Sequence, residues 1–409
     1  MFNEESITIM EPLLPAEGDP ELENLVFELV TKATPLASNL PTQVRESVGN
    51  LVRSMNCYYS NLIEGHNTHP RDIERALAED FSDIPEQREL QLEAKAHIEV
   101  QQLIDSQEVP DNFLSEEYIC WLHQEFCLRL PAEMLVVKNP DTGEERVMVP
   151  GAIRTSGVQV GQHIAPYAKS IPKFLVRYAE GYALKGLSRV RQIIAIPASH
   201  HRLLWIHPFY DGNGRVTRLL SHAFLKKTGV GSSLWSVSRG LSRDSQTYKR
   251  LLMAADAPRH GDHDGRGSRT AKGLKAFCEF FLKTCIDQVE FMDSVLQLPG
   301  LLNRIERYSA EEIAEGRLPH GSFLLLKEAL VMGEFPRGKV VDILGYKERQ
   351  ARTVLTKLVE QGFLVSDTPK GSVRLGFPIE VIEKWFPKLY PTSLDFSKSS
   401  NSMYIPLIF

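Results

Sequence analysis

Cysteine is scarce in this chain, with five residues among 409 and no CxxC pair. An odd number of widely spaced cysteines does not form a disulfide scaffold, and the short pairs that commonly hold zinc are missing. We therefore expect reduced thiols, no zinc site and a cytoplasmic setting. Cys278 and Cys285, seven residues apart in a helical stretch, are expected to be neighbours in the core.

Long apolar runs and a surplus of positive charge are also missing. No apolar stretch approaches the roughly 18 residues needed to cross a bilayer, so we expect no membrane partner. The first residues, MFNEESITIMEPLLP, lack a basic segment followed by an apolar one, so no secretory signal is expected. The net charge of −5 excludes a whole-molecule attraction to nucleic acid or anionic lipid, and any such attraction must be local.

What the sequence does contain is helical periodicity over most of its length. Apolar residues recur every three or four positions in 41–65, 85–107, 115–130, 171–185, 189–205, 214–228 and 274–297. Between 139 and 172 the chain is instead rich in glycine and proline, and alternating segments at 146–149 and 157–160 predict strands or a hairpin. The polar, glycine-rich segment 257–273 predicts a long surface loop.

A second pattern begins near residue 300. Helical segments at 310–316, 322–333, 337–344 and 347–361 precede two short strands around the Pro-Lys-Gly turn of GFLVSDTPKGSVRLGF. Helix, helix, turn, helix and two-stranded wing is the order of a winged helix-turn-helix. The sequence thus predicts an all-α core with a β-hairpin, followed by a small α+β winged-helix domain. We place an N-terminal helical region at 1–110, the core at 111–299, the winged helix at 300–390 and a C-terminal tail at 391–409.

The segment HPFYDGNGRVTR, residues 207–218, suits a bound polyphosphate. Gly212 and Gly214 permit positive φ and leave backbone N–H groups uncovered where the next helix starts, which forms an anion-binding turn. Asp211 at the mouth of that turn would repel phosphate unless Mg²⁺ lay between them. Taken alone, DGNG is also a common tight-turn sequence.

Three further side chains of this segment fit the same interpretation. His207 titrates near neutral pH and can act as a base. Arg215 and Arg218, three residues apart, share a helix face and can hold phosphate oxygens with forked donors. Individually, a histidine before a turn is more often structural, and arginines on a helix are usually solvated. Their combination in one short segment favours a shared role in phosphate chemistry.

The same segment resembles the signature of the Fic family, HxFx(D/E)GNGRxxR, at every specified position. The resemblance implies a helical Fic core that transfers AMP from ATP to a Ser, Thr or Tyr hydroxyl of a target protein. His207 would then be the general base, and Asp211 would hold Mg²⁺ on the α- and β-phosphates. The phosphates would be bound by Gly212, Asn213 and Gly214, with Arg215 on the β-phosphate and Arg218 on the γ-phosphate.

The stretch GAIRTSGVQVGQHIAPYAKSIP, ahead of this motif, resembles the flap of the same family. A flap is a hairpin that holds the target segment by main-chain pairing, which needs an exposed strand edge and little side-chain specificity. Val158, Gln159 and Val160 are the predicted docking edge. A plain structural hairpin is the alternative interpretation.

A third resemblance concerns SNLIEG, residues 60–65, which matches the inhibitory motif (S/T)xxxE(G/N) of this family. Ser60 and Glu64 are four apart and share one helix face. The resemblance implies that Glu64 pairs with Arg218 in the place of the γ-phosphate, in the class whose inhibitory helix is N-terminal to the core. A solvated glutamate at a helix end is the alternative. Members of this class also reverse the reaction, so removal of AMP from the target stays open.

The nucleobase pocket is harder to place. The stretch TYKRLLMAAD, residues 247–256, resembles the corresponding region of the family, with Tyr248 and Asp256 as candidates. Donor preference therefore stays open between ATP and other nucleotides. Adjacent His200 and His201 point about 100° apart on a helix, which favours core or supporting roles over a metal site shared with His207.

The predicted winged helix carries the local positive charge. Residues 336–376 contain eight basic and four acidic residues, a balance of +4 against −5 for the whole chain. Contact with DNA is predicted through outward basic side chains of the recognition helix and the wing: Lys347, Arg349, Arg352, Lys357 and Lys370. Winged helices also dock proteins or form dimers, and both alternatives stay open.

Two functions therefore compete. The first is an autoinhibited adenylyltransferase that modifies a target protein and itself. The second is a nucleotide-sensing transcription regulator that acts through the winged helix. An intact His207 favours the first, because sensing needs no base. We expect a homo-oligomer in the bacterial cytoplasm, and the family also includes exported effectors without cleavable signals.

Overall fold

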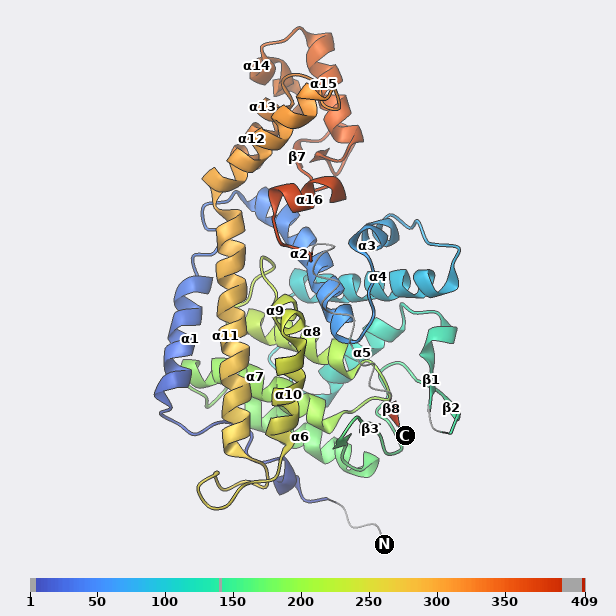
Figure 1. The fold of residues 1–409 in the computed structure, drawn as a ribbon, viewed down its shortest axis with the longest axis vertical. Coiled ribbons are helices and arrows are strands. Elements are labelled where there is room, and N and C mark those ends of the chain that lie inside the picture. The colour runs from blue at the N-terminus through green and yellow to red at the C-terminus, as the bar shows by residue number, and fades with distance from the viewer. Residues whose placement is uncertain (1–4, 140–141, 392–406, 409) are drawn as a thin grey trace. The chain divides into compact units, whose positions relative to one another are not determined.

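A computed structural model describes residues 5–139, 142–391 and 407–408, which fold into two compact units (Figure 1). The first unit holds the described residues of Met1–Thr34, Asn56–Gln288 and Ser402–Phe409, and the second those of Pro35–Met55 and Val289–Asn401. The predicted boundaries had placed residues 35–55 with the N-terminal region. Two long helices, α2 (Thr42–Ile63) and α11 (Ala271–Leu296), contribute residues to both units.

The first unit is helical, as the periodicity predicted. Its helices are α1 (Pro20–Ala33), α3 (Pro70–Leu77), α4 (Pro85–Ser106), α5 (Glu116–Cys127), α6 (Ile171–Tyr182), α7 (Arg189–Ile206), α8 (Asn213–Lys227), α9 (Val237–Arg243) and α10 (Ser245–Asp256). Most residues of α7 and α8 are buried, and the two helices pack on each other at the centre of the unit. A helix that is buried on all faces offers rigid support for the residues at its ends.

The glycine- and proline-rich stretch of the first unit forms two hairpins. β1 (Val136–Lys138) pairs with β2 (Glu145–Val147), and β3 (Gln159–Val160) pairs with β4 (His163–Ile164). A third strand, β8 (Leu407–Ile408), pairs with the other edge of β3. The sequence predicted strands in this stretch but not their division into two hairpins.

The second unit combines helices with one small sheet. Its helices are α12 (Leu298–Ala314), α13 (Ser322–Met332), α14 (Val340–Leu344), α15 (Glu348–Glu360) and α16 (Ile379–Trp385). The antiparallel sheet has the order β5 (Glu334–Phe335), β7 (Val373–Leu375), β6 (Leu364–Val365). This is the element order predicted for a winged helix-turn-helix, with β5 as an additional strand. The predicted helix at 310–316 is wrong in its start, because α12 already begins at Leu298.

The cysteines lie as the sequence suggested. All five are free thiols, and Cys278 and Cys285 are both fully buried in α11. In the described residues, no helix combines the length and apolar character needed to cross a membrane.

Candidate active site

The residues of the 207–218 motif gather around a cavity of about 280 Å³ in the first unit. The cavity lies where α7 ends and α8 begins, and its other walls come from the end of α2, the tip of the β3–β4 hairpin and α10. Most of the predicted site residues line it: Glu64, Val160, His207, Asp211, Gly214, Arg215, Arg218, Tyr248 and Asp256. The lining does not include Ser60, Val158, Gln159, Gly212 and Asn213.

His207 ends α7 in a left-handed conformation, with φ 51° and ψ 63°. Its backbone N–H caps the helix by donating to Leu203 O at 3.0 Å, and its Nδ1 lies 3.3 Å from Leu204 O. A carbonyl oxygen only accepts, so Nδ1 carries the proton and Nε2 is left as a lone pair. Nε2 is buried and has no hydrogen-bond partner among the described residues.

The electrostatic surroundings keep this imidazole neutral. Burial, together with smaller effects of the neighbouring His163 and Arg154, lowers the pKa of His207 to about 3. A neutral ring with an unpaired Nε2 at a cavity wall is the arrangement that a proton acceptor requires.

The turn after His207 is closed by Asn213. Its Oδ1 accepts from Phe209 N at 3.0 Å, and its Nδ2 donates to Phe209 O at 2.9 Å. Gly212 supplies the positive φ of 79° that lets α8 start at Asn213. Both polar atoms of the Asn213 side chain are thus used by the loop, which favours a role in shaping the turn over direct contact with phosphate.

Arg215 is held between two carboxylates. Its Nη1 donates to Glu93, and its Nη2 donates to Asp211 Oδ2 at 2.7 Å. A further hydrogen bond joins Glu93 Oε2 to His66 Nδ1 at 2.7 Å. Burial would raise the pKa of Glu93, but the charge of Arg215 and the bond to His66 outweigh it and hold that pKa below its usual range. The guanidinium of Arg215 also lies 5.0 Å from the ring centre of Phe126.

Arg218 is occupied by the end of α2. Its Nε donates to Ser60 Oγ at 2.8 Å, and its Nη2 donates to Ser60 O at 3.1 Å and to Glu64 Oε1 at 2.5 Å. Arg218 is only 3% exposed, whereas the Glu64 side chain keeps 33% of its surface at the cavity. A Cβ at Gly214 would overlap the Glu64 carboxylate, so glycine at this position admits the glutamate. The predicted pairing of Glu64 with Arg218 is thus present.

The far wall of the cavity carries Tyr248 and Asp256. The Tyr248 hydroxyl is hydrogen-bonded to His200 Nε2 at 2.7 Å, and both side chains are buried. Asp256 lies between His163 Nδ1 at 3.1 Å and His201 Nε2 at 3.2 Å. His200 and His201 therefore support α10 from behind, as expected, and neither is directed to His207.

Several residues that the sequence analysis missed organise this site. Arg154 is 1% exposed, and its three shortest hydrogen bonds go to the carbonyls of His207 at 2.7 Å, Ser156 at 2.7 Å and Pro166 at 2.6 Å, with a longer one to Ile206 O at 3.5 Å. It thereby ties the start of the β3–β4 hairpin to the catalytic loop. Arg154 was not predicted from the sequence, because a single arginine outside a motif gives no sign that it will link two segments through their carbonyls.

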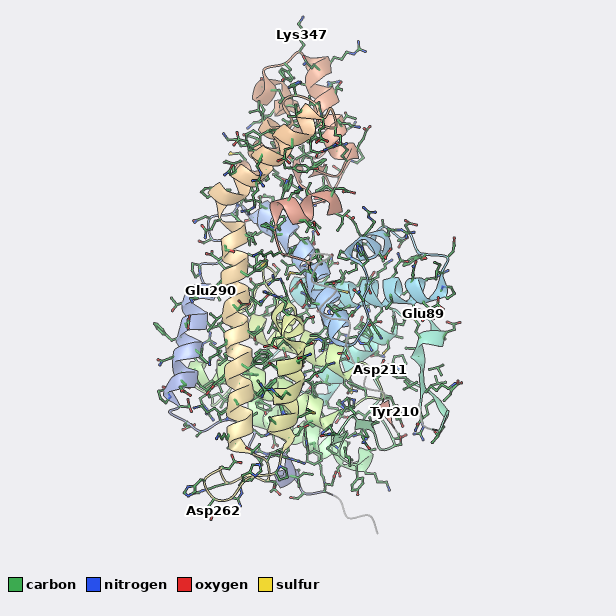
Figure 2. The ribbon with its side chains drawn as sticks, in the orientation of Figure 1. Glu89, Tyr210, Asp211, Asp262, Glu290 and Lys347 are labelled. Carbon is green, nitrogen blue, oxygen red and sulfur yellow. The ribbon has the colours of Figure 1, made fainter. Side chains whose placement is uncertain are left out.

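A cluster of hydroxyl groups surrounds Tyr210, which belongs to the 207–218 motif. The Tyr210 hydroxyl receives hydrogen bonds from Thr155 N at 3.1 Å and from Arg146 Nη1 at 3.2 Å. Burial raises the pKa of Tyr210, but these bonds and one with Ser156 outweigh it and lower the pKa to about 8. Figure 2 shows Tyr210 beside Asp211, where it can hold the loop against β2 and the hairpin.

The comparisons with known proteins agree with this geometry. Residues 113–225 match the Fic/DOC family. These residues form a Fic domain. The match runs through α5 to α8 and so covers His207–Arg218, whereas Ser60 and Glu64 lie outside it.

Relatives of this Fic chain carry the name protein adenylyltransferase Fic. The one from Nematostella vectensis is 27% identical over 205 residues, which are 50% of this chain and 43% of the relative. The one from Drosophila melanogaster is 33% identical over 79 residues, 19% of this chain and 16% of the relative. The chain thus spans less than half the length of these relatives.

Two solved structures share the fold. A Fic family protein from Desulfovibrio desulfuricans G20 has a TM-score of 0.51 at 18% identity and covers 89% of this chain and 98% of its own. A Fic domain containing signaling protein from Bacteroides thetaiotaomicron VPI-5482 has a TM-score of 0.50 at 18% identity and covers 67% of this chain and 97% of its own.

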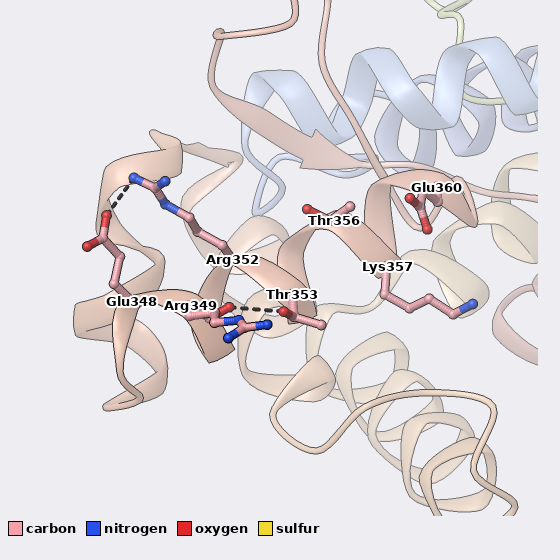
Figure 3. A pocket seen from close by; sticks show the side chains of 7 residues that line it. All are labelled: Glu348, Arg349, Arg352, Thr353, Thr356, Lys357 and Glu360. Atoms are coloured by element: carbon pink, nitrogen blue, oxygen red, sulfur yellow. Dashed lines mark hydrogen bonds and ion pairs between the residues drawn. The ribbon is translucent and has the colours of Figure 1, made fainter.

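The second unit holds a separate candidate surface on α15. Ala351, Val354, Leu355 and Leu358 face the core, and the opposite face carries Arg349, Arg352, Thr353, Thr356 and Lys357 (Figure 3). Arg352 Nη2 donates to Glu348 Oε1 at 2.5 Å, so its charge is partly compensated. The side chain of Lys347 extends away from the ribbon (Figure 2). The predicted basic positions 347, 349, 352 and 357 thus all lie outside the core of this unit.

Proposed function

We propose that this Fic protein is an autoinhibited protein adenylyltransferase, which transfers AMP from ATP to a Ser, Thr or Tyr hydroxyl of a target protein and of itself. The observation that carries the proposal is the neutral His207, which lines the same cavity as two buried guanidinium groups and whose Nε2 has no hydrogen-bond partner among the described residues. The names of the relatives favour adenylate transfer over other phosphate chemistry.

In the proposed reaction His207 Nε2 takes the proton of the target hydroxyl. The hydroxyl oxygen then forms a bond to the α-phosphorus, and the bond from that phosphorus to the oxygen of the β-phosphate breaks, so that pyrophosphate leaves. Arg215 and Arg218 would hold the β- and γ-phosphates with forked donors. The N–H groups at the start of α8, after Gly212, would face the phosphate charge.

Asp211 would hold Mg²⁺. Its carboxylate lines the cavity, its side chain is 44% exposed, and hard oxygen ligands next to phosphates suit this cation. Burial would raise the pKa of Asp211, but the charge of Arg215 and the N–H of Gly212 outweigh it and keep the group ionised. Mg²⁺ would neutralise phosphate charge there. Asp211 must then share its charge between the cation and Arg215.

The inhibition follows from the contacts of Arg218. A γ-phosphate cannot pair with this guanidinium while Glu64 does, because both anions need the same forked donors. In the inhibited state, ATP would therefore bind with its γ-phosphate displaced from Arg218. The Glu64 carboxylate also lines the cavity, which supports the reverse reaction, with Glu64 orienting a water that removes AMP from the target.

One experiment tests donor, reaction and direction together. The Glu64→Gly variant is incubated with ATP, GTP, CTP or UTP and Mg²⁺, and the intact mass is recorded. We expect one or more additions of AMP with ATP, and none in the Glu64→Gly, His207→Ala double variant. Additions in the double variant would contradict the role of His207 as base. Incubation of this modified variant with added unchanged chain and Mg²⁺, without nucleotide, then measures AMP removal, which should be lost when the added chain is Glu64→Gly.

For the second unit we propose a winged helix-turn-helix that contacts DNA through α15. Its support is the outward basic face of α15 and the neighbouring Lys347. Lys370 lies in the turn between β6 and β7, where a wing would reach the backbone of a duplex. A regulator that only senses nucleotide in the first unit would need no proton acceptor, which is why the enzyme is preferred. Docking of a protein and a homo-oligomeric state stay predictions.

A further inference from the structure

Strand β3 carries a third strand in addition to its hairpin partner. It lies between β4 and β8, and both pairings are antiparallel. In the second pairing Gln159 stands opposite Ile408, and Val160 stands opposite Leu407. Figure 1 shows β8, at the red end of the colour scale, next to β3. A segment far away in the sequence thus occupies the outer edge of the hairpin.

This paired edge belongs to a hairpin that forms part of the cavity wall. Val160 of β3, Gly161 and Gln162 of the turn and His163 of β4 line the cavity together with His207. Because the pairing is antiparallel, Leu407 stands at the turn end of β3, and Ile408 stands one position further from the turn. β8 therefore starts beside the cavity-lining turn and runs away from it.

An exposed strand edge accepts one partner at a time, because each N–H and C=O on that side pairs with a single neighbour. Such pairing selects extended backbone more than side-chain identity. We propose that Leu407–Ile408 blocks in cis the edge of β3 on which a target segment would pair, so that the target must displace β8. The proposal rests on the proposed transfer of AMP to protein targets. It adds a block on the target to the block that Glu64 places on the nucleotide.

The sequence around β8 indicates the chemistry of a competing partner. Residues 399–409, SSNSMYIPLIF, contain no charged side chain. On β4, the other neighbour of β3, Ile164 is 76% exposed, and Tyr167 after that strand is 58% exposed, which offers apolar surface on the same hairpin. The segment that displaces β8 should therefore be extended, uncharged and rich in large apolar residues. Among the described residues, two residue pairs join β8 to β3, so such a segment can compete with it.

The pairing itself is tested by a disulfide between opposite positions. Directly paired residues of antiparallel strands have Cβ atoms about 4.5–5.5 Å apart, close to the spacing that a disulfide needs. Mild oxidation of the Gln159→Cys, Ile408→Cys variant should give an intramolecular bond, identified as a linked peptide by mass spectrometry. The Gln159→Cys, Leu407→Cys variant, one position out of register, should give at least fivefold less. Equal yields would overturn the proposal, and so would a disulfide-linked dimer.

Competition is tested with a fluorescent peptide of residues 401–409, NSMYIPLIF. We expect a chain shortened to residue 401 to bind this peptide at least tenfold more tightly than the full chain, since a strand docked for about nine-tenths of the time lowers apparent affinity tenfold. The same peptide methylated on the backbone nitrogens of Leu407 and Ile408 is the control and should bind neither chain. Equal binding by both chains would overturn blocking in cis.

These two measurements need no nucleotide. They can therefore fail while AMP transfer is observed, and they can succeed while it is not. In the Glu64→Gly background, the Leu407→Pro, Ile408→Pro variant removes both N–H groups of β8. This variant should label the added NSMYIPLIF peptide with AMP more strongly than the matched Leu407→Ala, Ile408→Ala control, which keeps both N–H groups. If neither variant labels the peptide, the same order is expected for its binding. No difference between the two would contradict main-chain pairing.

Discussion

Arg218 has one guanidinium but two competing uses. It donates to Ser60 and Glu64 in this structure, and the proposed reaction needs it for phosphate. We expect Glu64→Gly to raise self-labelling by α-labelled ATP roughly 10- to 100-fold, because a charge-assisted hydrogen bond contributes about 1.5–3 kcal/mol. Ser60→Ala should raise it less, since the Ser60 carbonyl still accepts from Arg218. Equal labelling by Glu64→Gly and the unchanged chain would contradict inhibition by this contact.

His207 yields a prediction about pH. An ordinary imidazole with a pKa near 6.5 is roughly nine-tenths protonated at pH 5.5, so a base of that kind would lose about tenfold in kcat/KM between pH 7.5 and 5.5. The pKa of His207, lowered to about 3, keeps the ring neutral over this range. We therefore expect kcat/KM of the Glu64→Gly variant to change less than threefold, measured at constant ionic strength. A tenfold loss would show that the ring titrates normally.

The lowered pKa of His207 also affects how the free energy of unfolding depends on pH. The effect has the opposite sign to that of a histidine whose pKa is raised by a charged partner. Because the folded pKa of His207 lies below the unfolded value, the unfolded state takes up the proton first. This residue therefore lowers the free energy of unfolding progressively as the pH falls below about 6.5. His207→Ala should be less sensitive to acid between pH 6.5 and 4 in urea unfolding. An unchanged acid dependence would argue against a buried neutral ring.

Glu93 is expected to be a structural partner of Arg215 and not a surface charge. The glutamate is 2% exposed, and breaking a buried pair costs about 3–5 kcal/mol, because the other charge stays buried. Glu93→Gln should therefore lower the free energy of unfolding by roughly 3 kcal/mol in a denaturant titration. Glu99→Gln on the same helix removes only the half-exposed partner of Arg129 and should cost below about 1 kcal/mol. Similar losses for both variants would contradict the assignment.

At the scale of elements, the start of α8 was predictable and its support was not. The glycines, Asp211 and the two arginines stand within one short segment, so their spacing alone indicates a turn, a helix start and a shared face. Glu93 reaches Arg215 from α4, and His66 reaches Glu93 from the segment after α2, over separations that no local pattern encodes. The pairing of Glu64 with Arg218 was expected from the resemblance alone, because residue spacing does not bring α2 to α8.

Arg154 links two elements, the β3–β4 hairpin and the loop that follows α7. A lysine has one compact ammonium group in place of the planar fork and cannot reproduce bonds to three carbonyls in different directions. We expect Arg154→Lys to speed amide hydrogen exchange at least tenfold in residues 155–166, measured by mass spectrometry. Arg129→Lys, which changes an arginine that pairs with Glu99 and Glu125, is the control and should change these amides much less. Equal exchange in both variants would contradict this link.

At the scale of the whole molecule, the net charge of −5 makes any binding of DNA a local property of the second unit. We expect the full chain to bind a 30-base-pair duplex of mixed sequence in a gel shift, with affinity falling as salt rises. Arg349→Ala and Lys347→Ala should each reduce the salt slope by about one. Arg307→Ala, which removes a 76% exposed arginine from α12 of the same unit, is the control and should leave binding unchanged. Equal losses of DNA affinity in all three variants would argue for a diffuse attraction to DNA. If the full chain does not bind DNA, the surface of α15 would be assigned to a protein partner.

The division of the chain into units was the part least open to sequence reasoning. Periodicity locates α2 and α11 but says nothing about where along a helix its packing partners change. Ser47, in the first half of α2, donates to Leu375 O of β7 at 2.9 Å, and this places residues 35–55 with the second unit. The predicted boundary at 300 was drawn from the order of helical segments that follows it, and it falls within α12, which begins at Leu298.

The division of α2 between the two units has a consequence for control of the proposed activity. Ser47 belongs to the unit that carries α15, and Ser60, on the same unbroken helix, holds Arg218 in the other. Suppose that a ligand binds the second unit and favours one position of this helix. Such a ligand would change the affinity of the first unit for nucleotide by some factor. Thermodynamic linkage then requires the nucleotide to change the affinity for that ligand by the same factor, so the two occupancies would report on each other.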